Sequence, residues 1–159
     1  MRTIQKISPA IHLKIFTHSK KITEEEKHYF NETFKTWKNV WSDVFSHEMN
    51  LNTRLFSNDF TRQHHILSLF FGNKCVGTVF MREVDFSLLT TIEDSYFRFW
   101  PLDILQSISG ENSQVVIVSN FTIDKEFRQS QHFEWKTLLM CLFVDYFKTL
   151  NQPLMISAA

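Results

Sequence analysis

The sequence predicts a single α/β domain, spanning residues 1–159, in which a mixed and mostly antiparallel sheet is flanked by helices. Segments rich in β-branched and aromatic residues alternate with longer segments of helical period. A glycine-containing turn joins two of the β-type segments, which predicts an antiparallel hairpin. The chain has 159 residues, of which 43% are hydrophobic, enough for one core and too few residues for two ordinary domains.

The N-terminal third predicts a strand followed by a long helix. Alternate apolar residues from Ile11 to Thr17 face one side, as a half-buried strand requires. Thr23 and Glu26 have the spacing of a capping box and start a helix from about Glu24 to about His47. An apolar stripe follows at helical spacing, at Phe30, Phe34, Trp37, Trp41 and Val44. We interpret this stripe as packing against the core, although an acyl-chain pocket would need the same residues.

The middle of the chain predicts a loop, a hairpin and an irregular segment. Asn50 to Gln63 is polar and is expected to be a loop with at most a short helical turn. His65 to Phe71 and Val76 to Val84 are β-rich runs on either side of Gly72, whose freedom to adopt positive φ suits a turn. Phe86 to Gly110 has mixed periodicity, so it predicts a helical insertion or an ordered loop.

The C-terminal part predicts a strand, a long helix and a last short strand. Val115 to Ile123 is β-branched and of strand length, and Phe133 to Leu150 has apolar residues at helical spacing. Pro153 marks the exit from that helix, and Leu154 to Ile156 is expected to be the fifth strand.

Composition excludes several classes of function. Seventeen Lys and Arg balance seventeen Asp and Glu, so no overall positive field favours nucleic acid as a partner. No apolar run approaches the roughly 20 residues of a membrane span, and no secretory signal is visible, so we expect a cytoplasmic protein. Cys75 and Cys141 lack metal-binding spacing and are expected to be reduced thiols.

Few side chains suggest a metal site or covalent catalysis. His64 and His65 are adjacent, and neighbours on a strand point to opposite faces, so we expect no metal. Ser119 is a weak candidate nucleophile, because no base for it can be identified.

The stretch from Val115 to Arg128, followed at once by a helix, resembles the GNAT superfamily of acyl-CoA N-acyltransferases. In that family a strand offers backbone groups to the pantetheine arm of the donor, and a turn beginning with Arg or Gln holds the pyrophosphate. A helix N-terminus suits this role because its unpaired N–H groups attract an anion. Arg128 matches the first position of the turn. The resemblance implies these donor-binding residues: Phe121, Thr122, Ile123, Arg128, Gln129, Ser130, Gln131, His132 and Phe133.

The same stretch departs from the family pattern. Gln131 and Phe133 stand where glycines are usual, so side chains come close to any bound phosphate. Ser119 to Ile123 also resembles a strand of the acyl-homoserine-lactone synthases and N-acyl amino acid synthases, which accept acyl groups from acyl carrier protein. Asn120 replaces the Arg of that strand, and Ile117 stands where the lactone synthases carry a Glu. Two interpretations follow: a donor site remodelled for a carrier with one phosphate, or a site that no longer binds an acyl donor.

The resemblance implies an N-acyltransferase that moves an acyl group from acyl-CoA or an acyl carrier protein thioester to an amine such as an amino acid. The alternative is a catalytically inactive GNAT-like module that binds a protein or forms a homodimer. GNAT domains continue past the fifth strand with a helix and two strands. Because this sequence stops there, we expect a fold truncated after that strand, with an edge open to dimerisation.

Overall fold

One five-stranded sheet organises the chain, and its strand order follows the sequence, β1-β2-β3-β4-β5. The computed structural model describes residues 10–48, 55–97, 100–111, 113–130, 133–152 and 155–157. The strands are β1 (Ile11–Thr17), β2 (His65–Phe71), β3 (Lys74–Asp85), β4 (Gln114–Ile123) and β5 (Met155–Ser157). The helices are α1 (Glu24–Asp43), α2 (Ser57–Thr61), α3 (Leu89–Ile92), α4 (Leu102–Glu111), α5 (Lys125–Arg128) and α6 (Trp135–Thr149).

The sheet is mixed and mostly antiparallel, as the sequence predicts. The first four strands pair antiparallel with their neighbours. β5 pairs parallel with β4, over only three residue pairs from Val116 to Val118. The strands predicted at Ile11–Thr17 and His65–Phe71 have the predicted bounds. β5 starts at Met155, and the predicted first residue of this strand, Leu154, lies outside the described residues, as does Pro153.

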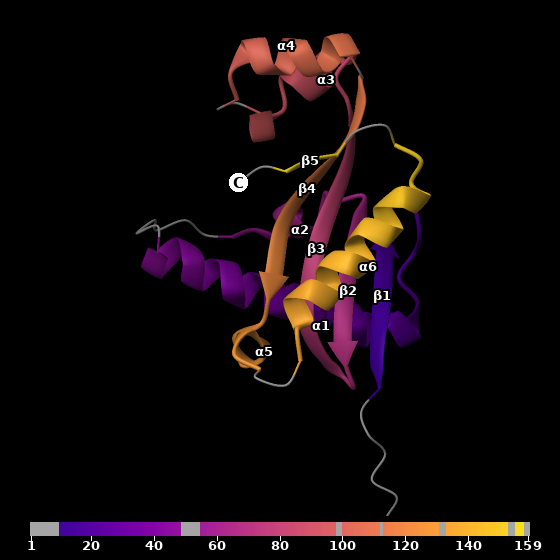
Figure 1. Ribbon diagram of the computed structural model, residues 1–159, viewed down its shortest axis with the longest axis vertical. Coiled ribbons are helices and arrows are strands. Elements are labelled where there is room, and N and C mark those ends of the chain that lie inside the picture. The colour runs from indigo at the N-terminus through magenta and orange to yellow at the C-terminus, as the bar shows by residue number, and fades with distance from the viewer. Residues whose placement is uncertain are drawn as a thin grey trace, which may run out of the picture.

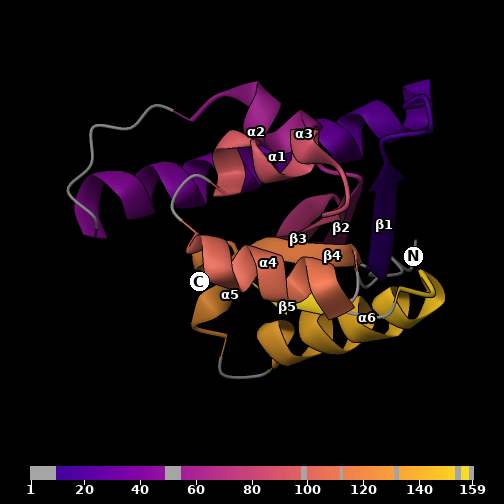
Figure 2. The same ribbon diagram turned by 90° about the horizontal axis from the view of Figure 1, so that it is seen from above.

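Helices cover both faces of the sheet. α1 lies across one face and α6 across the other, while α3 and α4 lie at the end of the sheet where β4 begins (Figures 1 and 2). On the α1 face, Trp37 packs with Phe60 and Phe80 in one buried cluster. On the α6 face, Phe143 packs with Val79 and Val116 in another. The sheet therefore separates two hydrophobic layers.

The predicted long helix is confirmed, with a change at its end. Thr23 accepts the backbone N–H of Glu26, whose carboxylate returns to the backbone N–H of Thr23, so the capping box is formed. The α-helix stops at Asp43, and one π-helical turn, Val44–Glu48, continues it. Trp37 is 1% exposed and belongs to the core, which agrees with the packing interpretation of the aromatic stripe.

The β2–β3 turn fits the predicted hairpin, with Gly72 at φ 61°. β3 is longer than the predicted Val76–Val84 and reaches Asp85, four residues beyond Met81, which is its last residue that pairs with β2. α2 is the short helical turn allowed for in the loop between residues 50 and 63.

The irregular segment after β3 is a helical insertion. α3, a 3-10 turn (Ser95–Phe97) and α4 fold over the start of β4. Phe86, Phe97 and Leu105 of this insertion pack on Val115 and Ile117 of β4. Of the two possibilities that the sequence left open, the helical one is therefore correct.

Candidate functional site

A β-bulge reshapes β4 at the point where the family resemblance is most specific. Phe80 pairs with Ser119 and Thr78 pairs with Thr122, so two residues of β4, Asn120 and Phe121, oppose one residue of β3. Asn120 has φ 53°, a left-handed conformation that Asn tolerates better than most residues. The extra residue reverses the alternation of side chains along the rest of the strand.

Two indole groups of α1 hold the bulge. The Nε1–H of Trp37 donates to Oδ1 of Asn120 over 3.2 Å, and that of Trp41 donates to Oγ1 of Thr122 over 2.9 Å. The Thr122 hydroxyl in turn donates to the backbone oxygen of Asn120 over 2.7 Å. The side chains of Asn120 and Thr122 are therefore committed to α1, whereas Phe121 and Ile123 face α6.

The outer edge of β4 is covered over only part of its length. β5 pairs with residues 116–118, and no later β4 residue has a β5 partner among the residues that the structure describes. Backbone groups of residues 119–123 on this edge can accordingly bond to an extended ligand, apart from the oxygens of Asn120 and Ile123, which already accept hydrogen bonds from Thr122 and Arg128. Ser119, the weak nucleophile candidate, lies at the start of this open edge, where its Oγ accepts a hydrogen bond from Nδ2 of Asn120.

The open edge leads to a tight turn and to the start of α6. Asp124 caps α5 by accepting the N–H of Glu126 over 2.9 Å. Arg128 folds back and donates its Nε–H to the backbone oxygen of Ile123 over 2.8 Å. This bond fixes the guanidinium group beside the end of β4 and does not use its two terminal nitrogens, which are potential donors.

Some cationic side chains at this end of the sheet form ion pairs and others do not. Lys74 binds Glu126 over 2.8 Å, and Lys125 binds Asp43, whose pKa the hydrogen bond from Lys125 lowers. In contrast, Arg128 and Lys136 form no ion pair within the part of the chain that the structure describes. These two cations remain to attract an anion.

A pocket of about 360 Å³ lies between these cations. Its wall comprises Phe121, Ile123, Phe127, Arg128, Ser130, Phe133, Glu134, Trp135 and Lys136. α6 starts here without a side-chain cap, because Glu134 makes no capping hydrogen bond, so its first N–H groups are unpaired within the helix. The positive end of the helix dipole adds to the charge of Lys136 in the first turn. Glu134 also lines the pocket, so two cations and a helix N-terminus stand against one carboxylate, and this positive balance suits a phosphate-sized anion.

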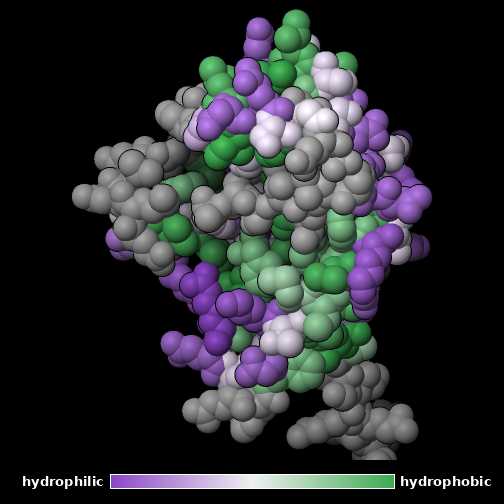
Figure 3. Space-filling model, turned by 45° about the horizontal axis from the view of Figure 1, so that its top comes forward, coloured by the Kyte–Doolittle hydropathy of each residue, from purple (hydrophilic) through white to green (hydrophobic). Residues whose placement is uncertain are grey.

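Aromatic side chains form the rest of the wall. The Phe133 and Trp135 rings lie 4.3 Å apart between centroids, and Phe127 meets Trp135 edge-on at 5.5 Å. Phe133 is 41% exposed. Hydrophobic side chains gather in the lower middle of the face in Figure 3, where β4 ends and α6 begins. Phe133, which occupies a usual glycine position, therefore forms a wall of the pocket.

The structure brings together only some of the predicted donor-binding residues. Phe121, Ile123, Arg128, Ser130 and Phe133 line the same pocket. Thr122 offers only its backbone, because its buried side chain binds α1. Gln129 lines a second, more open hollow with Phe133 and Trp135. Gln131 and His132 lie outside the described residues.

Sequence reasoning missed four residues that line the pocket, Phe127, Glu134, Trp135 and Lys136. Phe127 and Trp135 pack on each other, and Lys136 lies in the first turn of α6. A lysine near a helix start opposes the usual preference for acidic residues there, and this departure could have drawn attention to Lys136. Among the described residues no group of three or more His, Cys, Asp or Glu is arranged to hold a metal ion. None of the described helices has the length and apolarity required to span a bilayer.

The fold matches acyltransferases of known structure. The chain aligns with FeeM, an N-acyl amino acid synthase from uncultured soil microbes, over 91% of its length and 68% of that chain, with a TM-score of 0.58 and 13% identity. It aligns with a GNAT family acetyltransferase of Staphylococcus aureus over 94% and 86%, with a TM-score of 0.51 and 15% identity. For an aminoglycoside acetyltransferase from an uncultured soil metagenomic sample, the coverage is 94% and 77%, with a TM-score of 0.52 and 8% identity.

Sequence comparison adds nothing to this likeness, since no family model and no curated protein match the chain. The structural matches show that the chain has a GNAT-like fold, and the predicted mixed, mostly antiparallel α/β fold is confirmed.

Proposed function

We propose that this chain, which has the GNAT fold, is an N-acyltransferase that moves an acyl group from a thioester of coenzyme A or acyl carrier protein to an amine such as an amino acid. The observation that carries the proposal is the open edge of β4, which runs from the bulge at Asn120 to a cationic pocket at the start of α6. Solved structures with the same fold are acyltransferases, which supports the same class of reaction.

The cationic pocket and the open edge of β4 would bind different parts of the donor. Arg128, Lys136 and the free N–H groups of α6 would bind the phosphate of the donor. The pantetheine arm would run along residues 119–123 of β4 and bond to their backbone. The thioester would then lie near the bulge, where backbone N–H groups polarise its carbonyl.

The reaction needs no covalent enzyme intermediate. The neutral amine attacks the carbonyl carbon, a C–N bond forms and the C–S bond breaks. The amine loses one proton, and the thiolate leaving group takes up one proton. Positioning of the two reactants is the main contribution of the protein, since an intramolecular arrangement replaces a bimolecular encounter.

The phosphate contacts can be tested with two variants. Arg128→Ala and Lys136→Ala should each weaken donor binding about tenfold, because each removes a charge-assisted hydrogen bond. Calorimetry would be carried out with coenzyme A, an acyl-CoA and an acyl-loaded carrier protein. Lys148→Ala, at the opposite end of the same helix, is the matched control and should bind donors like the wild type.

The calorimetry distinguishes between the possible donors and tests whether they bind at the proposed site. Tighter binding of the loaded carrier than of coenzyme A would identify a donor with a single phosphate. Unchanged donor affinity in Arg128→Ala, with saturable binding by the wild type, would place the donor elsewhere. Arg128 also bonds to the backbone of Ile123, so its loss could destabilise the fold. If Arg128→Ala loses donor affinity and folding stability to a similar extent, that result would also count against direct contact with the donor.

The alternative function is a catalytically inactive module that pairs with itself or with another protein. Two observations favour this module: Phe133 stands where the family usually has a glycine, and one edge of β4 is exposed. Size-exclusion chromatography with mass detection discriminates the two: a stable dimer without affinity for any thioester donor supports the module. A monomer that binds a donor supports the enzyme.

A further inference from the structure

The first strand, β1, forms one border of the sheet, because β2 is its only neighbour among the described strands. It lies on the far side of the sheet from β4 and β5 (Figure 1). An edge strand presents a row of unpaired backbone N–H and C=O groups, which can pair with another strand. The edge of β1 is therefore a second open edge, distinct from the edge of β4 at which the donor is proposed to bind.

The pairing with β2 fixes which backbone groups of β1 point away from the sheet. Gly72 donates its N–H to the oxygen of Ala10 over 3.0 Å, and His18 donates its N–H to the oxygen of His64 over 2.9 Å. Between these two bonds the residues pair one to one, so β1 residues alternate between bonding to β2 and facing outward. The outward backbone groups are those of Ile11, Leu13 and Ile15.

The same three residues have apolar side chains on one face of the strand. Ile11 is 43% exposed and Ile15 is 37% exposed. Leu13 is half-buried, because it packs against the buried cluster on the α6 face of the sheet. In β1 this face has no charged side chain. An exposed apolar stripe along an unpaired edge is a surface that favours association.

β1 lacks the features by which edge strands usually avoid pairing. It contains no proline, and its pairing with β2 contains no bulge. A lysine at an edge often opposes association, but Lys14 lies on the opposite face from the apolar stripe. Its ammonium group is 4.6 Å from the centre of the Tyr29 ring of α1. This contact directs the charge of Lys14 toward α1 and leaves the stripe uncharged.

A second copy of β1 complements this edge in an antiparallel register centred on Leu13. With a twofold axis beside Leu13, this residue pairs with Leu13 of the second copy, and Ile11 pairs with Ile15. All of these residues have outward backbone groups, so each pair exchanges two hydrogen bonds. Their apolar side chains also contact each other across the axis. An axis beside Lys14 would instead place two lysines directly opposite each other, which is unfavourable.

We infer that two copies of this chain associate through β1, so that their two five-stranded sheets form one continuous sheet. The pairing covers Ile11 and Ile15 and satisfies the outward backbone groups of the edge. Because the interface is limited to one strand from each copy, we expect a reversible dimer with a dissociation constant between about 1 µM and about 1 mM. No β1 residue lines the donor pocket, so the association does not depend on acyl transfer.

Sedimentation velocity of the purified chain, from about 1 µM to about 1 mM, tests the inference. We expect the average mass to rise with concentration from that of one chain, 19.0 kDa, toward twice that value. The mass of a single chain over the whole range overturns the inference. A mass that continues to rise past two copies also overturns it, because a twofold pairing of two edges is closed.

Substitutions in the apolar stripe locate the interface. Ile15→Lys and Ile11→Glu should each weaken the dimer about tenfold or more, because each places a charge against an isoleucine of the second copy. Leu89→Lys and Leu102→Glu introduce the same charges at residues that are 73% and 66% exposed, outside the sheet, and should leave the dimer unchanged. Unaltered association in both stripe variants would place the interface elsewhere and overturn the assignment.

The double variant Ile11→Glu with Ile15→Lys tests the register. In the proposed pairing, the introduced carboxylate of each copy faces the introduced ammonium group of the other. We expect the double variant to associate about fivefold more tightly than either single variant, because opposite charges then lie directly across the strands. Such recovery also shows that the single variants are folded. A double variant that associates no more tightly than the single variants overturns the proposed pairing.

Failure of this inference is distinguishable from failure of the proposed function. Ile15→Lys should bind coenzyme A or the loaded carrier protein like the wild type, because Ile15 lies outside the donor pocket. A wild-type chain that binds a donor but stays monomeric overturns the β1 pairing and leaves the acyltransferase intact. A dimer that the stripe variants dissociate, but that binds no donor, supports the β1 pairing and counts against the acyltransferase.

Discussion

Gly77 illustrates how one residue sets the distance between sheet and helix. A Cβ at this position would lie 2.4 Å from the backbone oxygen of Thr122 and 3.2 Å from a methyl group of Leu139 in α6. The first contact involves backbone and cannot be relieved by rotation of a side chain. Glycine therefore allows the end of β4 and α6 to approach β3 closely.

Gly77→Ala should lower the free energy of unfolding by about 1–3 kcal/mol, the usual cost of overpacking. Urea denaturation followed by tryptophan fluorescence measures this loss. Gly110→Ala is the control, because nothing lies within 4 Å of the added Cβ and alanine is favoured within α4 by up to about 1 kcal/mol. Equal stability of wild type and Gly77→Ala would contradict the contact.

The two thiols differ in environment. Both are free, but Cys75 is buried and Cys141 is exposed. Burial raises the pKa of Cys75 to about 12, because the low-dielectric interior disfavours the thiolate. At pH 8 we expect a disulfide reagent to modify Cys141 alone in the native protein and both thiols in denaturant. Native Cys141→Ser should not react, and rapid reaction of that variant would show that Cys75 is accessible.

Individual site residues were only partly predictable from the sequence. Arg128 could be found because the turn after a strand and before a helix has a recognisable pattern. Phe127 and Trp135 could not, since they come from α5 and α6, which meet only beside the end of β4. The bulge at Asn120 also left no mark in the pattern, because its conformation depends on hydrogen bonds from α1 that are distant in sequence.

Among the structural elements, the insertion formed by α3, the 3-10 turn and α4 has a polar anchor besides its hydrophobic cluster. Arg82 of β3 bonds to Asp94, which lies just before the 3-10 turn, and both side chains are about one-fifth exposed. The hydrogen bond from Arg82 lowers the pKa of Asp94. This pair ties the insertion to the sheet.

Asp94→Asn should destabilise the fold by about 1–3 kcal/mol at pH 7, the typical worth of a hydrogen bond to a charged group. A carboxylate whose pKa is lowered by folding stabilises the protein above its unfolded pKa, and this contribution is lost as the pH falls through the folded pKa. The difference between Asp94→Asn and wild type should therefore shrink below about pH 4. Asp145→Asn, in an exposed pair, should change stability by less than about 1 kcal/mol. A difference that does not depend on pH would exclude the Asp94 carboxylate as its source.

Helices and strands with a clear hydrophobic period could be predicted from the sequence, whereas the shorter elements could not. The capping box and stripe of α1, and the alternation in β1, are local features that the fold preserves. α5 has only four residues, too few to show a period. α3 and α4 are stabilised by contacts with Val115 and Ile117, so their position depends on residues outside the segment.

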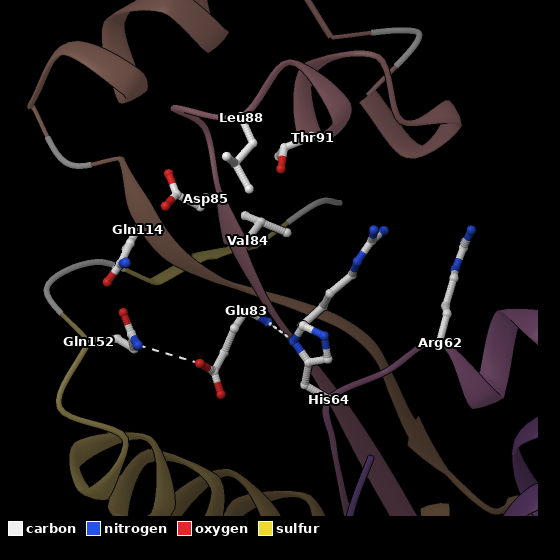
Figure 4. Close-up of a pocket in the computed structure, with 10 residues that line it drawn as sticks. Arg62, His64, Glu83, Val84, Asp85, Leu88, Thr91, Gln114 and Gln152 are labelled. Carbon is white, nitrogen blue, oxygen red and sulfur yellow. Dashed lines mark hydrogen bonds between the residues drawn. The ribbon is translucent and has the colours of Figure 1, made fainter. Parts of the chain in front are cut away.

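The whole molecule has no net charge, yet its two pockets differ electrically. Seventeen positive residues balance seventeen negative ones, whereas the pocket at the start of α6 includes two cations, Arg128 and Lys136, that form no ion pair among the described residues, and the pocket at the other end of β4 (Figure 4) is lined by two arginines and two carboxylates. Electrostatic attraction for ligands is therefore local to each end of the sheet and carries little long-range steering.

Salt should weaken donor binding. Raising the ionic strength from about 0.1 M to about 1 M shortens the screening length from about 10 Å to about 3 Å. Donor binding through the exposed Arg128 and Lys136 should therefore weaken several-fold. Calorimetry at both ionic strengths measures this, and salt-independent donor affinity would argue against the phosphate contacts.

The agreement between strand order and chain order bears on how the protein folds. β2 and β3 are separated by a turn at Gly72 and Asn73, and a hairpin of this kind closes within microseconds. β5 can pair with β4 only after α5 and α6 are in place, so its loop-closure entropy is larger. We expect the β2–β3 hairpin to form early and the β4–β5 pairing late. Pulse-labelling hydrogen exchange should accordingly protect amides of β2 and β3 before those of β5.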